Sequence, residues 1–228
     1  MTRARIVAQD IAVGLPDGAQ TRGLLIRPAQ ASAMFVFAHG AGAGMRHVFM
    51  EDVAQELAGC GIATLRFDFP YMHAGGKRPD RPEVAHAAVR GAVDAAAQAA
   101  PDLPLFAGGK SFGGRMTSQA QAIMPLPGVR GLVFTGFPLH PRKKPAVERA
   151  AHLDGLRLPM LFIQGTRDEL ADLDLVGNVC AGLGTRATLH LVESADHAFA
   201  TPARAGRSRS QIISQIAEAA SSWMKAHS

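Results

Sequence analysis

Apolar residues occur along this chain in short, near-continuous runs, which are separated by longer stretches with helical spacing. Continuous runs, unlike alternating ones, are typical of strands that are buried on both faces of a sheet. The runs lie at residues 34–38, 62–69, 103–108, 131–135, 159–164 and 187–192. We therefore predict a strand at each of these six positions.

Between the runs, apolar positions recur at the spacing of one helix face. Helices are expected at residues 47–58, 82–99, 112–124, 172–182 and about 210–225. The last of these places Ile212, Ile216 and Trp223 on one face. Strands that alternate with helices in this way predict an α/β fold with a doubly wound, mostly parallel sheet.

The beginning of the chain has a different pattern. Pro16-Asp17-Gly18 is a strong turn signal between two weaker strand patterns, at residues 6–13 and 21–27. This predicts an antiparallel hairpin that leads into the parallel sheet. Because no linker, low-complexity tract or internal repeat interrupts the chain, we expect one domain over residues 1–228.

Composition narrows the class of protein. Hydrophobic residues make up 47% and charged residues 19% of the chain, which excludes a disordered protein. The formal net charge of +5 raises the question of nucleic-acid binding, but the basic residues are scattered and no recognition motif accompanies them. We therefore expect no nucleic-acid partner. Cys60 and Cys180 lie in helix-like contexts and are expected to be free thiols.

Membrane and export signals are also not expected. The basic residues at the start are not followed by the apolar stretch of a signal peptide, and no apolar run reaches the length of a membrane span. The sequence thus favours a cytoplasmic protein without a membrane partner. It does not predict an oligomeric state.

A candidate nucleophile lies in the segment Gly109-Lys110-Ser111-Phe112-Gly113, a G-x-S-x-G motif. The motif alone is weak evidence for a nucleophile, because a glycine-rich strand–helix turn with a non-catalytic serine has the same sequence pattern. Here an apolar run precedes it and a helical stretch follows, which is the strand–turn–helix setting of a nucleophile elbow. The two outer glycines provide the room that so sharp a turn needs. We predict that Ser111 is a nucleophile.

A serine hydroxyl needs a base within hydrogen-bond reach. His197 lies in the loop after the last predicted strand, where the base belongs in the chain order Ser, acid, His. The other eight histidines fit worse, because they lie on helix surfaces, inside a strand or on other connections. They are His39, His47, His73, His86, His140, His152, His190 and His227.

An acid is needed to orient the histidine. Asp168 follows the fifth predicted strand directly, whereas residues 130–147 contain no Asp or Glu. Asp168 is therefore the expected acid, although a turn or capping aspartate remains an alternative reading. Loop geometry does not follow from spacing, so Glu169, Asp172 and Asp196 stay open as well.

Acyl transfer also needs N–H groups that stabilise the negative oxygen of the transition state. The backbone N–H of Phe112, directly after the serine, is one candidate. The second is expected from the glycine-rich loop 39–44, at Ala41 or, nearly as well, at Gly42. A phosphate-binding loop would require a Gly-Lys-Ser/Thr ending, which is missing here. No metal and no organic cofactor are implied.

With these residues in place, the chain resembles the α/β-hydrolase superfamily over nearly its whole length. More narrowly, it resembles the small lid-less members grouped with testis-expressed protein 30 and with the hydrolase-like subunit 3 of the non-specific lethal complex. That likeness rests on the segments 35–44, 65–72, 108–116, 164–168 and 196–197. It implies an α/β-hydrolase fold and the Ser-His-Asp triad. Dienelactone-hydrolase-like esterases are more distant relatives and typically carry cysteine at the nucleophile position.

The function expected from the Ser-His-Asp triad is a serine hydrolase, esterase-like or thioesterase-like, acting on small acyl substrates. A catalytically idle scaffold or binding protein of the same fold is the alternative, and a perhydrolase using the same triad is a third possibility. The segment 137–156, where larger relatives insert a lid, is short, so we expect an open pocket. Gly42, Tyr71, Met72 and Phe137 are candidate lining residues.

Two basic features of the sequence have no role in the expected triad. The run Arg142-Lys143-Lys144 lies on the short lid segment, so its charges could attract an anionic substrate or could simply be solvated. Lys110, beside the candidate nucleophile, is expected to form a salt bridge beneath the turn, with Asp68 as the partner.

Overall fold

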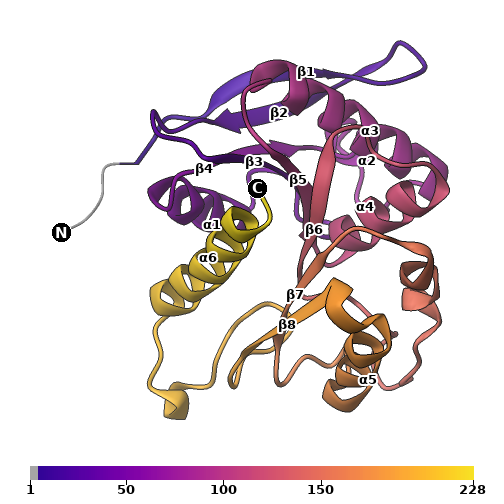
Figure 1. Cartoon of the computed structure of the whole chain (residues 1–228), viewed down its shortest axis with the longest axis vertical. Coiled ribbons are helices and arrows are strands. Elements are labelled where there is room, and N and C mark those ends of the chain that lie inside the picture. The colour runs from indigo at the N-terminus through magenta and orange to yellow at the C-terminus, as the bar shows by residue number, and fades with distance from the viewer. Residues whose placement is uncertain (1–4) are drawn as a thin grey trace.

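An eight-stranded mixed sheet runs through the molecule and carries helices on both faces (Figure 1). The computed structural model describes residues 5–228. The strands are β1 (Gln9–Gly14), β2 (Gln20–Ile26), β3 (Ala33–Ala38), β4 (Ile62–Phe67), β5 (Leu105–Lys110), β6 (Val129–Thr135), β7 (Met160–Gly165) and β8 (Ala187–Val192). All six continuous apolar runs and both weaker strand patterns of the sequence are thus strands.

The strand order is β1-β2-β4-β3-β5-β6-β7-β8. β1 and β2 form an antiparallel hairpin, and β2 also pairs antiparallel with β4. Every strand from β3 to β8 is parallel to its neighbours within that set. The predicted fold class, a mostly parallel α/β sheet with an N-terminal antiparallel hairpin, is confirmed.

The helices also follow the sequence pattern closely. They are α1 (Val48–Gly59), α2 (Pro70–His73), α3 (Pro82–Ala99), α4 (Phe112–Ile123), α5 (Leu173–Leu183) and α6 (Arg209–Ala226), with three 3₁₀ segments, η1 (Glu148–Gly155), η2 (Gly184–Arg186) and η3 (Ala203–Ala205). The five predicted helices are present with ends within one residue or so of those expected. The single turn α2 was not predicted, because four residues are too few to show a helical period. Between β6 and β7, where a lid would be inserted, the only helical element is η1.

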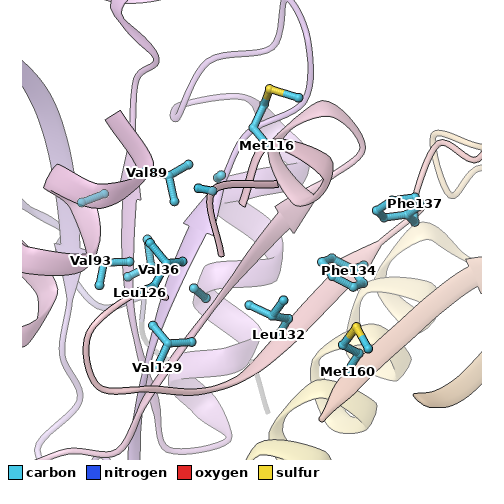
Figure 2. Close-up of a cluster of buried hydrophobic side chains, with 14 of the residues drawn as sticks. Val36, Val89, Val93, Met116, Leu126, Val129, Leu132, Phe134, Phe137 and Met160 are labelled. Atoms are coloured by element: carbon cyan, nitrogen blue, oxygen red, sulfur yellow. The ribbon is translucent and has the colours of Figure 1, made fainter. Parts of the chain in front are cut away.

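Alternation along the central strands divides the core into two layers. In β3, Phe35 and Phe37 belong to the apolar cluster under α1 and α6, whereas Met34 and Val36 belong to the cluster under α3, α4 and α5. Figure 2 shows the second cluster, in which Val36 lies near Val89 and Val93 of α3. Because both faces are covered, the central strands are buried and mostly apolar, as the sequence pattern indicated.

This topology determines where a site can form. Parallel strands end at the same edge of the sheet, so the loops that follow β5, β7 and β8 meet there. Those loops carry residues 111, 168 and 197. Over residues 5–228, no helix has both the length and the apolar character needed to cross a bilayer.

Candidate active site

Ser111 occupies the sharp turn between β5 and α4. Its backbone has φ 50° and ψ −113°, a conformation that residues other than glycine rarely adopt. The chain also passes very close to β3 here, since a Cβ on either Gly109 or Gly113 would lie 2.4 Å from the carbonyl oxygen of Ala38. The two glycines of the motif are therefore required by close backbone packing, and the turn that they allow presents the serine at the sheet edge.

Three side chains from three different loops lie in hydrogen-bond contact. The Ser111 Oγ and the His197 Nε2 are 2.8 Å apart, and the His197 Nδ1 lies 2.7 Å from Oδ2 of Asp168. A carboxylate can only accept, so Nδ1 carries the proton in the neutral ring and Nε2 is left to accept from the serine hydroxyl. This arrangement is suited to moving the hydroxyl proton onto the ring.

Asp168 is held rigidly. Its side chain is fully buried, and besides His197 it accepts hydrogen bonds from Nε2 of Gln164 at 2.6 Å and from the backbone N–H of Leu170 at 2.8 Å. These donors stabilise the charged form of the carboxylate and fix its direction. His197 is more accessible, with 26% of its side chain exposed.

The other acids that the sequence left open are engaged elsewhere. Glu169 pairs with Arg142, and Asp172 caps the start of α5 by accepting from the N–H of Leu175. Asp196 accepts from backbone amides of its own loop, at residues 198 and 200. Of the four candidates, Asp168 is the carboxylate that the structure brings to His197.

Two backbone amides near Ser111 have no acceptor within the described chain. Phe112 opens α4, and the first amides of a helix have no acceptor within it. In the described chain, the amide of Ala41 has no acceptor either. The amide of Gly42 donates to the hydroxyl of Tyr71 at 2.9 Å. Of the two candidates in the glycine-rich loop, Ala41 is the one with a free N–H.

A pocket of about 350 Å³ opens beside these groups. Its wall is mainly apolar, with Ser111, His197, His47 and Lys110 among the polar groups that line it. The apolar lining comes from Ala41, Ala43, Phe49, Met50, Leu170 and Ala198. Phe49 and Met50 stand at the start of α1, directly after the glycine-rich loop, and that position is the signal by which the sequence could have revealed them.

The wall of this pocket does not include the predicted lining residues Gly42, Tyr71, Met72 and Phe137. Tyr71 is buried and supports the glycine-rich loop through Gly42, and Met72 packs against the same loop, close to Gly44. Phe137 packs into the core against aromatic rings of β6 and β7, as Figure 2 shows for Phe134. The rings of Tyr71 and Phe137 turn inward, a direction that residue spacing does not reveal.

The expected salt bridge between Lys110 and Asp68 is also wrong. The Lys110 Nζ donates to the backbone carbonyl of His197 at 2.6 Å. Asp68 accepts from the N–H of Met45 and lies 3.4 Å from Arg22 instead. Burial lowers the pKa of Lys110 to about 8, an effect that the nearby Asp168 partly offsets.

The basic run on the short lid segment is partly neutralised. Arg142 forms an ion pair with Glu169, and both side chains are exposed. Lys143, the next residue, has φ 59°.

Among the residues described, no cluster of three His, Cys, Asp or Glu side chains could hold a metal ion. Cys60 and Cys180 are free thiols.

A serine on a strained strand–turn–helix, a histidine after the last strand and an acid between them define the α/β-hydrolase class of protein. Residues 31–225 match the model of the alpha/beta hydrolase domain family, so the chain belongs to that family. The match covers everything from the start of β3 into α6.

Solved structures share this fold along the whole chain. The dienelactone hydrolase of Anabaena variabilis superposes with a TM-score of 0.76 at 22% identity and covers 98% of this chain and 99% of its own. The esterase domain of a Rhodothermus marinus protein gives 0.71 at 18% identity, covering 96% and 98%. An α/β serine hydrolase without a lid from Xanthomonas campestris gives 0.66 at 18% identity, covering 87% and 89%.

Proposed function

We propose that this protein is a serine hydrolase that cleaves small carboxylic esters or thioesters through an acyl-enzyme. The observation that carries the proposal is the continuous chain of contacts from Ser111 through His197 to Asp168, at 2.8 and 2.7 Å, beside an open pocket. Each member has the chemical form that its role requires: a hydroxyl donor, an imidazole with one free acceptor and a buried carboxylate.

In the first half of the reaction, the Ser111 Oγ forms a bond to the substrate carbonyl carbon while its proton passes to the His197 Nε2. The carbonyl π electrons move onto the oxygen, where the amides of Ala41 and Phe112 stabilise the negative charge. The adduct then collapses, the bond to the leaving oxygen or sulfur breaks, and the leaving group takes the proton from Nε2. Asp168 keeps the ring oriented and stabilises its positive charge.

In the second half, water takes the place of the serine hydroxyl. Its proton passes to the His197 Nε2 as its oxygen attacks the acyl carbon, and the proton then returns to the Ser111 Oγ as the acid leaves. The exposed edge of His197 and the open pocket give water access to the acyl-enzyme.

The pocket favours small acyl groups. Its volume of about 350 Å³ lies at the lower end for ligand pockets. The alanine, phenylalanine, methionine and leucine side chains around it suit a short aliphatic or a single aromatic group. The dienelactone hydrolase and the esterase domain that share the fold are consistent with this class of substrate.

Two finer predictions accompany the proposal. Within the family, we place the chain with the lid-less members that resemble testis-expressed protein 30, on the basis of residues 65–72 and 108–116. We also propose a cytoplasmic location. The idle-scaffold alternative gains no support from the site, since a pure scaffold needs neither a strained serine nor a buried acid aligned with a histidine.

A fluorophosphonate probe tests the proposal directly. Attack of the Ser111 Oγ on phosphorus displaces fluoride and leaves a covalent adduct, which mass spectrometry locates. We expect one labelled site at Ser111, no labelling in Ser111→Ala and full labelling in Ser118→Ala, because Ser118 is a buried serine of the same helix. A folded wild-type protein that remains unlabelled would overturn the proposal.

The substrate class is tested with p-nitrophenyl esters of increasing acyl length. Turnover should be highest with acetyl or butyryl esters and lower by about tenfold or more with decanoyl esters, because the longer chain exceeds the pocket. Equal turnover across the series would contradict the small-substrate part of the proposal and leave the serine mechanism intact.

A further inference from the structure

Lys110 is a buried cation at the centre of the site, and the proposed chemistry does not use it. It precedes Ser111 in the chain, is 8% exposed, and reaches the loop after β8 with its ammonium group. There its Nζ donates to the backbone carbonyl of His197 at 2.6 Å. Among residues 5–228, this bond and the Ser111–His197 contact are the hydrogen bonds that join the histidine loop to the β5–α4 turn.

The surroundings of this ammonium are unusually poor in counter-charge. The rings of Phe49 and Phe199 lie over it, with centroids 5.9 and 5.2 Å away. The carboxylates that face it, Asp168 and Asp196, are close enough to act on it electrostatically, but neither forms an ion pair within 4.0 Å. Burying a cation with so little compensation is unfavourable for stability.

A buried lysine that bridges the nucleophile turn and the histidine loop calls for a functional reason. The loop is also tied to the loop after β7, where the N–H of Ser194 donates to Thr166 Oγ1 at 2.8 Å and the N–H of Arg167 donates to the carbonyl of Ala195 at 2.9 Å. Neither bond reaches the β5–α4 turn. Positive φ at Ser194 and Phe199 on either side of His197 shows that its backbone is held in a sparsely populated conformation. Of the bonds that hold this loop, the one from Lys110 fixes the backbone of His197 relative to the turn that carries Ser111.

We propose that Lys110 is a positioning residue, which ties the carbonyl of His197 to the turn that carries Ser111 and acts on the imidazole through its charge. This inference rests on the proposed serine hydrolase function. Since residues 110 and 111 are adjacent, the tether holds the base in register with the nucleophile. The charge of Lys110 also attracts the Asp168 carboxylate, which orients the ring.

The titratable groups around this cation are few. Asp168 follows β7, Asp196 and His197 lie on the loop after β8, and His47, the N-cap of α1, also lines the pocket. Burial lowers the pKa of Lys110 to about 8. The group therefore carries its proton throughout the range between pH 5 and 7, in which a histidine base gains and loses activity.

Two substitutions separate the tether from the charge. Lys110→Met removes both and keeps an apolar chain of similar length between the two rings. Lys110→Gln removes the charge and keeps an N–H donor. The matched controls are Lys225→Met and Lys225→Gln, because the exposed Lys225 also donates to a backbone carbonyl, that of Cys60 at 2.8 Å, in a different part of the fold.

The measurement is the second-order rate constant of fluorophosphonate labelling at Ser111, from pH 5 to 9, together with the melting temperature. We expect Lys110→Met to slow labelling by about 10- to 100-fold, since a small misplacement of the base has effects of this size. Lys110→Gln should slow it less. In both variants the pH of half-maximal labelling should move upward, because the ring is protonated more easily without a cation beside it.

Stability gives the second readout. Replacement of a poorly compensated buried cation by an apolar side chain should leave the melting temperature unchanged or raise it. A slower reaction in an equally stable protein supports the positioning role. If both Lys110 variants match the Lys225 controls in rate and in pH midpoint, the inference is wrong. It is also wrong if Lys110→Met loses stability and activity together while Lys110→Gln shows no shift in midpoint.

Failure of this inference differs from failure of the proposed function. A wild-type protein that is not labelled at any pH contradicts the hydrolase proposal, and the inference with it. A wild-type protein that is labelled at Ser111, with variants that are labelled equally well, contradicts the positioning role alone.

Discussion

Two serine–histidine pairs among residues 5–228 have the same Oγ–Nε2 distance but different surroundings. The Ser111 Oγ lies 2.8 Å from the His197 Nε2, and the Ser118 Oγ lies 2.8 Å from the His152 Nε2. Both serines belong to one segment, the first as the N-cap of α4 and the second within that helix. A short contact between a hydroxyl and an imidazole is therefore not enough to define a catalytic pair.

The first difference is charge. His197 has the Asp168 carboxylate on its second nitrogen, so a positive ring would be stabilised. His152 has cationic neighbours instead, and burial, followed by Arg115 and His86, lowers its pKa to about 4. That imidazole resists a proton rather than accepting one at neutral pH.

The second difference is the backbone. Ser111 adopts a positive φ at the end of a strand, which presents its hydroxyl to a pocket and to free amides. Ser118 is fully buried in regular helix and can donate to the carbonyl of Arg115 at 3.0 Å. Strain, access and an oriented acid together distinguish Ser111, the proposed nucleophile, from Ser118.

The sharpest way to break this comparison is to remove the acid from the first pair. Asp168→Asn leaves His197 with an amide neighbour, which cannot stabilise a positive ring and can favour the wrong tautomer. We expect kcat/KM for ester hydrolysis to fall by about 10⁴-fold, as in other triads. The control is Asp172→Asn, because asparagine caps a helix as well as aspartate does. Less than a tenfold loss in Asp168→Asn would show that Asp168 is not the orienting acid.

Substitution of a glycine in the turn at Ser111 tests the difference in backbone conformation between the two serines. In Gly113→Ala the new Cβ would meet the carbonyl oxygen of Ala38 at 2.4 Å, and neither backbone can yield. We expect a loss of about 3 kcal/mol in the free energy of unfolding, together with loss of labelling at Ser111. Gly177→Ala, on α5 with open space around it, should instead stabilise by about 0.5–1 kcal/mol. Urea denaturation measures both, and a Gly113→Ala protein as stable as wild type would refute the packing argument.

The smallest effect is expected from a substitution in the second pair, Ser118 and His152, and it concerns the pH dependence of stability. The folded protein binds a proton at His152 less readily than the unfolded chain does, because the pKa is lowered from 6.5 to about 4. The corresponding stability is fully present above pH 6.5 and is lost as the pH falls toward 4. His152→Gln should remove about 1 kcal/mol of this pH dependence, a modest value because the ring is partly exposed.

Urea denaturation at pH 7 and pH 4.5 checks this prediction, with the exposed His73→Gln as control. Labelling at Ser111 should be unchanged in His152→Gln at pH 7. A loss of labelling there would mean that the second pair takes part in the chemistry.

Periodicity in the sequence was sufficient to place the strands and the longer helices. Continuous apolar runs marked buried parallel strands, and the glycine turn at residues 16–18 marked the hairpin between β1 and β2. The order of the residues along the chain also identified Ser111, His197 and Asp168 as a candidate triad, since each follows a strand at the same sheet edge.

Side-chain direction was not predictable in the same way. Phe137 was expected in the pocket, but the chain turns at Gly136, with φ 68°, and sends the ring into the core. Phe49 and Met50 line the pocket and were not predicted. Lys110 was given the wrong partner, because its contact with His197 spans 87 positions and depends on how two loops pack.

The sequence by itself determined the order of the elements and the chemical types available at each strand end, because hydrophobic periodicity and glycine positions act over short range. The tertiary structure decided which of four acids meets the histidine, which amide of the glycine-rich loop stays free, and what forms the pocket wall. Those choices depend on contacts between residues 29 and 86 positions apart, which form only when the strands pack into one sheet.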